Sequence, residues 1–131
     1  MTTGNPSSAS LWSGRALSLL VTLVMIADAA VDLFHPSLVQ AEMAATGFPE
    51  GQVHLVGTII LVCAALYAIP RTSVFGAILM TGFLGGAICT HFRVGEIATA
   101  PQLVSLLLGG SAWGALYLRD LRVRTLLPLV D

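Results

Sequence analysis

The chain has 131 residues and a formal net charge of −1, with 56% hydrophobic and only 10% charged residues. Soluble domains carry about 25% charged residues, so this chain has too few charges to cover a surface that faces water. The length allows one domain at most, and no basic patch mixed with aromatic residues indicates a nucleic-acid partner. The composition therefore indicates an integral membrane protein that is surrounded by a lipid bilayer.

Four stretches with almost no charge are each about as long as a bilayer is thick. A helix needs roughly 20 apolar residues to cross the hydrocarbon core. We therefore expect an all-α fold, a four-helix transmembrane bundle that forms a single domain over residues 1–131. The pattern predicts a flexible tail over residues 1–11, followed by helices over about residues 14–34, 52–69, 73–92 and 102–119.

Turn-forming residues separate these helices. The first apolar stretch continues past Ala27-Asp28-Ala29, which mimics a signal-peptide cleavage site, so we expect a retained membrane anchor. Pro36 ends the first helix, because proline cannot continue a helix that needs its amide. Residues 37–46 are expected to form a short interfacial helix, and residues 70–72 predict a tight reversal.

Basic residues gather on one side of the predicted bundle. Four crossings place both termini and the middle connection together, and cytoplasmic loops are enriched in Lys and Arg. We therefore expect both termini in the cytoplasm and the protein in a bacterial inner (plasma) membrane. The basic side holds five of the six basic residues, and the opposite side holds one arginine and three glutamates: Arg15, Arg71, Arg119, Arg122 and Arg124 against Arg93, Glu42, Glu50 and Glu96.

The third and fourth predicted helices each carry a GxxxG pair, Gly82/Gly86 and Gly110/Gly114. Small residues let helix backbones approach closely in lipid, where there is little hydrophobic drive between helices. Two interpretations stay open, namely packing within one bundle and a face that binds a second copy.

The two cysteines, Cys63 and Cys89, form no CxxC motif and fall inside predicted helices. We interpret them as small apolar packing residues. The sequence does not decide whether they meet.

The ionisable residues within the helices gather at one depth, opposite the basic side. Asp28, Asp32 and His35 share one face of the first helix through their i, i+4, i+7 spacing. Charges near the bilayer centre cost several kcal/mol by insertion scales, so intramembrane acids are clues to function. We predict a polar pocket that opens toward the outer face, which the other helices complete with His54, Thr58, Thr90, His91 and Arg93.

Carboxyl groups beside histidines can perform acid–base or proton-relay chemistry. We therefore predict Asp28, Asp32 and His91 as catalytic residues. The spacing of Asp32 and His35 permits a metal site with another histidine without requiring one, so none is predicted. The alternative to a pocket is that the acids only join helices by hydrogen bonds. The remaining polar residues are predicted to bind substrate: His35, His54, Thr58, Thr90 and Arg93.

Residues 69–87, continued by Thr90-His91-Phe92-Arg93-Val94-Gly95, and residues 113–124 resemble the DoxX-like family of small membrane proteins. The resemblance implies a four-helix membrane bundle and assigns no chemical role to the family-like polar positions. We expect the basic side to be structural, with a network of Arg71, Arg119 and Asp120. The family-like polar positions are Arg71, Thr72, Thr90, His91, Arg93, Arg119 and Asp120.

The family is named for its likeness to a hydrophobic subunit of sulfur-oxidising, quinone-linked membrane complexes, and other relatives are redox partners or assembly factors. The resemblance thus favours a component associated with membrane redox chemistry that binds a lipophilic or quinone-like molecule. No haem-binding CxxCH or flavin motif is present, so electrons would come from a partner. A non-catalytic scaffold and a cofactor-independent isomerase or hydrolase of a lipophilic substrate are the alternatives, and enzyme activity stays open.

Overall fold

The structure is a computed structural model that describes residues 7–49 and 51–127. Within these ranges the chain is helical and contains no strand. Two helices, α1 and α4, are long and apolar enough to cross a membrane, and α3 is a shorter apolar helix. The helices are α1 (Ser8–Phe34), η1 (Pro36–Leu38), α2 (Gln40–Ala45), α3 (Val53–Ala68), α4 (Ser73–Arg93), α5 (Ala100–Arg119) and α6 (Leu121–Leu126).

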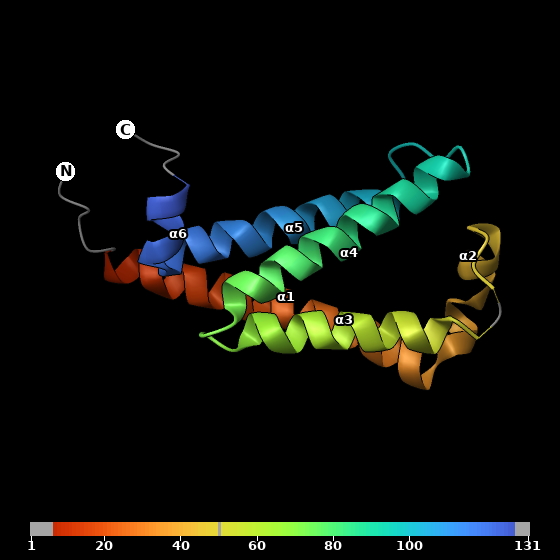
Figure 1. The fold of residues 1–131 in the computed structure, drawn as a ribbon, viewed down its shortest axis with the longest axis horizontal. Helices are drawn as coiled ribbons and strands as arrows, with labels where there is room; N and C mark the ends of the chain where they lie inside the picture. Colours follow the sequence, from red (N-terminus) through yellow and green to blue (C-terminus); the bar gives the residue numbers. More distant parts are fainter. Residues whose placement is uncertain (1–6, 50, 128–131) are drawn as a thin grey trace.

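The long helices α1, α3, α4 and α5 pack side by side (Figure 1). Helix α1 contacts α3 and α5, and α4 contacts the same two helices. Helix α6 lies at one end of this arrangement and α2 at the other, and we name the two ends after them (Figure 1). Toward the α2 end, the pair α1–α3 and the pair α4–α5 spread apart.

Helix α1 begins six residues earlier than the predicted start near residue 14. Its N-cap is Ser7, whose hydroxyl oxygen accepts a hydrogen bond from the backbone amide of Ser10 at 3.2 Å. The Ser10 hydroxyl in turn donates to the carbonyl of Leu118 at 3.1 Å, which joins the first turn of α1 to α5. The expected tail is therefore helical from Ser8, and residues 1–6 lie outside the described residues.

The polar network expected at the basic end is different in the structure. Asp120 caps α6 and accepts hydrogen bonds from the backbone amide of Arg122 at 3.0 Å and from its guanidinium at 2.9 Å. These hydrogen bonds from Arg122 hold the pKa of the Asp120 carboxyl below its usual value. The ion pair of Asp120 is with Arg122 rather than with Arg119, whose guanidinium lies over the ring of Tyr67 at 5.7 Å.

Tyr67 joins three helices in the tightly packed half near the α6 end. Its side chain is fully buried, and its hydroxyl donates to the Ala112 carbonyl at 2.9 Å and lies 3.3 Å from the Ser18 hydroxyl. A buried hydroxyl that is hydrogen-bonded in this way links α3 to α1 and α5. Cys63 is buried, Cys89 is exposed, and both are free thiols.

The glycines of the two GxxxG pairs do not pack against a neighbouring helix. A Cβ added at Gly82, Gly86, Gly110 or Gly114 would meet no atom within 4 Å. Of the two interpretations left open by the sequence, packing of these pairs within the bundle is therefore wrong. The close helix contacts are made instead by three other glycines: Gly14, Gly57 and Gly76.

Candidate functional site

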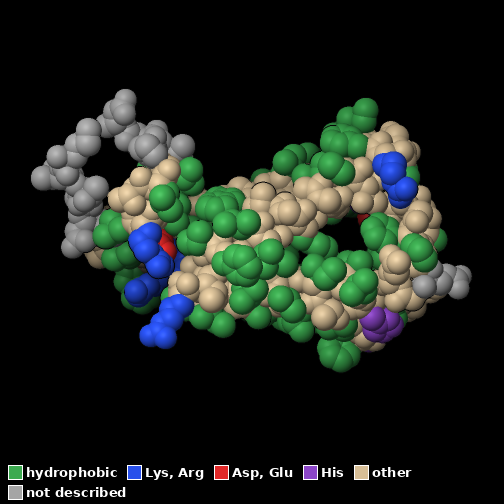
Figure 2. All heavy atoms as spheres, viewed as in Figure 1, with side chains coloured by type: hydrophobic (Ala, Val, Ile, Leu, Met, Phe, Trp, Pro, Cys, Tyr) green, Lys and Arg blue, Asp and Glu red, His purple; other side chains and the backbone are tan. Residues whose placement is uncertain are grey.

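The spreading of the two helix pairs leaves an opening near the α2 end. Figure 2 shows this opening in the space-filling surface, with an acidic side chain visible at its rim. We call it the cleft. Ionisable side chains from α1, α2, α4 and the loop after α4 interact with one another at this end, and we call them the acid–histidine cluster: Asp28, Asp32, Glu42, His91 and Glu96.

Asp32 is the most deeply buried acid of the cluster, with 6% of the residue exposed. Helix α3 comes close at this point, because a Cβ on Gly57 would lie 2.7 Å from the Asp32 Cβ. No described residue donates a hydrogen bond to the carboxyl group. Its oxygens are nevertheless not fully covered. In the described ranges, Arg119 Nε is the one fully covered side-chain polar atom that lacks a hydrogen-bond partner, and the Asp32 oxygens are not among such atoms. Asp32 therefore carries a carboxyl group that no described residue partners, close enough to Asp28 and Glu42 for their charges to act on it.

Asp28 lies one turn before Asp32 on the same side of α1. Its side chain is exposed, unlike that of Asp32. Both carboxyl groups are near enough to Glu42 of α2 for their charges to repel. Three acids from two helices thus face the same space.

His91 lies between two carboxyl groups. Its Nδ1 is 2.5 Å from Glu96 Oε2, and its Nε2 is 3.6 Å from Glu42 Oε1. The chain brings Glu96 back to His91 through a turn in which Gly95 has φ of +83° and the Glu96 amide donates to the His91 carbonyl at 3.1 Å. The imidazole is buried and links α4 to α2.

Arg93 holds the chain after α2 against the end of α4. Its Nη2 donates a hydrogen bond to the Thr46 carbonyl at 2.5 Å. Gly47 has φ of +82° and passes directly beside the guanidinium, where a Cβ would lie 3.0 Å from Nη2. The guanidinium is therefore engaged by the backbone after α2.

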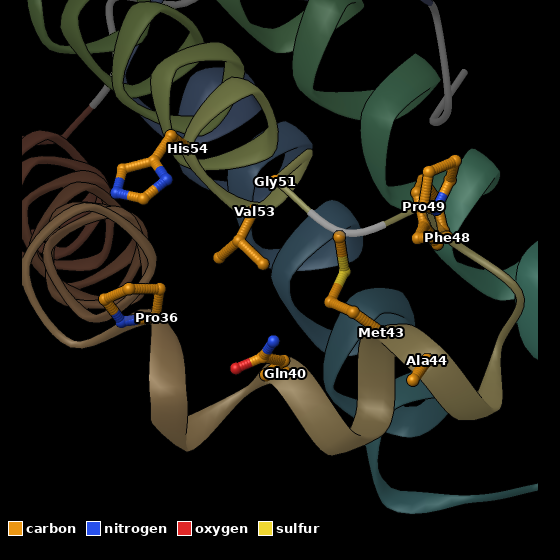
Figure 3. A pocket seen from close by; sticks show the side chains of 9 residues that line it. All are labelled: Pro36, Gln40, Met43, Ala44, Phe48, Pro49, Gly51, Val53 and His54. Atoms are coloured by element: carbon orange, nitrogen blue, oxygen red, sulfur yellow. The ribbon is translucent and has the colours of Figure 1, made fainter.

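His54 does not belong to the cluster. It lines a separate pocket of about 230 Å³ that α2, η1 and the start of α3 form. Figure 3 shows His54 and Pro36 at one end of this pocket and Phe48 and Pro49 at the other. His35 is exposed at the end of α1.

The two predicted threonines use their hydroxyls within their own helices. Thr58 donates to the His54 carbonyl at 2.7 Å, and Thr90 donates to the Gly86 carbonyl at 2.9 Å. Of the predicted site residues, the structure thus brings together Asp28, Asp32 and His91.

Sequence reasoning missed Glu42 and Glu96 as site residues and counted them only among the charges of the outer side. A signal for Glu96 is present, because a turn at Gly95 can return the chain to His91. No local pattern indicates Glu42, which reaches His91 only through the path of α2. Within residues 7–49 and 51–127, no group of three or more His, Cys, Asp or Glu side chains could hold a metal ion.

An apolar groove of about 390 Å³ lies between α3 and α4. It occupies the middle of these helices, from which they continue to diverge toward the cleft (Figure 1). The hydroxyl of Thr58 is the one polar side-chain group on its wall apart from the Cys63 thiol. The groove is lined by Thr58, Ile59, Val62, Cys63, Ile78, Leu79, Gly82 and Phe83.

Comparison with known proteins identifies the family. A model of the DoxX-like family matches residues 16–114, and no curated protein or solved structure matches the chain. The match agrees with the two helices that are long and apolar enough to cross a bilayer, and together they indicate a membrane protein. The chain belongs to the DoxX-like family, as the resemblance of residues 69–95 and 113–124 implied.

Proposed function

We propose that the chain is an integral membrane protein that binds a lipophilic molecule in the cleft, with the polar head of the molecule against the acid–histidine cluster. The observation that supports this most directly is the buried, unpartnered carboxyl group of Asp32. Burying a polar group without a hydrogen bond costs several kcal/mol relative to water. A bound head that donates hydrogen bonds removes this cost.

We further propose that α1, α3, α4 and α5 all cross the membrane with the α6 end in the cytoplasm of a bacterial inner membrane. The α6 end carries the arginines of the loop after α3 and of the chain after α5, which the positive-inside rule places in the cytoplasm. Helix α3 has 16 residues, or ~24 Å of rise. Short spans are accommodated by local thinning of the bilayer.

A quinone-like molecule and an association with membrane redox chemistry are the finer form of this proposal. Carboxyl groups and an imidazole in one cleft can supply and accept the protons that accompany reduction or oxidation of such a molecule. The same groups suit an acid–base reaction of a lipophilic substrate, which remains the enzymatic alternative. Electrons would come from a partner protein.

A scaffold role is the second candidate, and one observation favours it. The glycines of α4 and α5 that have no neighbour within 4 Å form outward-facing surfaces where another helix could approach closely. A second copy or a membrane redox partner is the occupant that this role requires.

The test is mass spectrometry of lipophilic molecules that co-purify with the full chain. We expect a molecule that accompanies the native protein, is depleted in Asp32→Ala and is retained in Asp120→Ala, which removes a carboxyl group at the opposite end. Equal amounts in the native protein and Asp32→Ala would contradict binding at the cleft. If no such molecule co-purifies, and the same membrane proteins co-purify with the native protein and with Asp32→Ala, the result would favour the scaffold.

A further inference from the structure

The charges around the cleft are strongly unbalanced. Four carboxyl groups belong to the cluster, and the one cationic side chain nearby with a fixed charge is Arg93. Its guanidinium is hydrogen-bonded to the Thr46 carbonyl and therefore anchors the backbone. His91 already lies between Glu42 and Glu96. Even a charged imidazole would therefore neutralise only part of the negative charge of those two acids.

Asp28 and Asp32 are thus the acids with no cationic partner among the described residues. Asp32 is nine-tenths buried, borders open space and accepts no hydrogen bond from a described residue. An anionic head placed here would add a further negative charge. A head that carries N–H donors and a positive charge would form charge-assisted hydrogen bonds, which are about twice as strong as neutral ones.

The surroundings of the cleft indicate what the apolar part of the bound molecule is. The α3–α4 groove is apolar, and the hydroxyl of Thr58 is already bonded to the His54 carbonyl. Ile59, Val62 and Leu79 are exposed on its wall, so the groove is accessible from the lipid side of α3 and α4. A hydrocarbon chain entering sideways from the bilayer would lie in it and direct its head toward the cleft.

We propose that the cleft selects an amphiphile with a cationic, N–H-bearing head, such as a long-chain primary amine, whose chain occupies the α3–α4 groove. This rests on the proposed function in its general form, a lipophilic molecule bound in the cleft, and it puts a cationic head in place of the quinone-like one. The negative charge of the cluster sets the preference for the head, and the groove sets the preference for one apolar chain.

The experiment uses the full-length protein in lipid nanodiscs and three probes with the same sixteen-carbon chain. The probes carry a photoreactive diazirine near the chain end and have an amine, an alcohol or a carboxylate as the head. Labelling at increasing concentrations measures affinity, and mass spectrometry of peptides locates the label. We expect the amine to bind about tenfold tighter than the alcohol, with its label on α3 and α4.

Variants separate the head from the chain. Asp32→Asn keeps the size of the side chain and should weaken amine binding about tenfold while leaving the alcohol unchanged. Asp120→Asn makes the same change in net charge at the α6 end and should leave both unchanged. Gly82→Leu fills the groove and should weaken all three probes, whereas Gly110→Leu, which also meets no neighbour but does not line the groove, should not.

The outcomes distinguish this proposal from the proposed function. Equal affinities for amine and alcohol, with no effect of Asp32→Asn, would overturn the cationic head while leaving a lipophilic site in place. Preference for the carboxylate would overturn it as well. Failure of all three probes to label the α3–α4 groove in a saturable way would overturn both the proposed ligand class and the chain-binding groove.

Discussion

Gly76 of α4 lies directly against the backbone of α3, and its replacement by alanine tests how these helices are held together. A Cβ at this position would lie 2.6 Å from the Cα of Tyr67 and 2.7 Å from the carbonyl carbon of Leu66. Distances under 3.0 Å are essentially never seen for real Cβ atoms. Because these neighbours are backbone atoms, no side-chain rotation can make room, and α3 and α4 must move apart.

The magnitude follows from what this movement disturbs. Adding carbon atoms to a well-packed core costs about 1–3 kcal/mol. Tyr67 cannot follow freely, because its hydroxyl is bonded to Ala112 of α5 at 2.9 Å. We therefore expect Gly76→Ala to lower the free energy of unfolding by about 3 kcal/mol, the upper part of that range.

Gly86→Ala in the same helix is the matched control. A Cβ there meets no atom within 4 Å, and alanine favours a helix over glycine by about 0.8–1.0 kcal/mol. The free energy of unfolding should be unchanged or slightly higher. Unfolding by sodium dodecyl sulfate in mixed micelles, followed by helical circular dichroism, measures both variants. Equal midpoints for Gly76→Ala and Gly86→Ala would refute the reasoning from close packing.

Two further predictions concern the α6 half. Tyr67→Phe removes the hydroxyl that donates a second hydrogen bond to the Ala112 carbonyl and should cost about 1 kcal/mol in the same titration; no loss would mean that this hydrogen bond contributes nothing. The Asp120 pKa is lowered below 3.8 by hydrogen bonds from Arg122, so its stabilisation of α6 is present above pH 3.8 and lost as pH falls through the lowered value. Amide NMR shifts of residues 121–126 should report that loss in the native chain, and Asp120→Asn should abolish the transition.

The sequence predicted the middle helices well, because their signals are local. The reversal at residues 70–72 and the apolar lengths on either side gave 52–69 and 73–92, and the structure has Val53–Ala68 and Ser73–Arg93. Both ends of the chain were predicted less well. Helix α6 and the first turn of α1 depend on long-range hydrogen bonds, such as that from Arg124 to the Ser10 hydroxyl at 3.0 Å.

Glycine spacing alone did not reveal which helix faces pack together. The two GxxxG pairs face outward, whereas Gly14, Gly57 and Gly76 each make a close contact without a glycine four residues away. The GxxxG pattern records that two small residues share a face, and it carries no information about whether that face meets a neighbour. Only the partner surface, here the backbones of Ala115, Ala29 and Tyr67, decides this.

For the site as well, the sequence predicts the position of a residue along its helix but not the direction in which its side chain points. Position along the helices placed Asp28, Asp32 and His91 at one level, and in the structure each of them interacts with Glu42. His54 lies at a similar level but faces another pocket, since α3 turns Gly57 toward Asp32. Depth can be counted along a sequence, whereas the rotation of α3 about its axis is fixed by packing that involves residues far apart in the chain.

The two ends of the molecule are held by different chemistry, and this separates stability from binding. Near the α6 end, the close contacts of Gly14 and Gly76 and the hydrogen bonds of Tyr67 fix the helices, and farther along Gly57 holds α3 against α1 beside Asp32. At the α2 end, polar contacts from His91 and Arg93 fix only the segment that crosses the cleft. No described contact of the fold uses the Asp32 carboxyl group. A change confined to that group is therefore expected to act on the binding proposed for the cleft and to leave the packing of the helices intact.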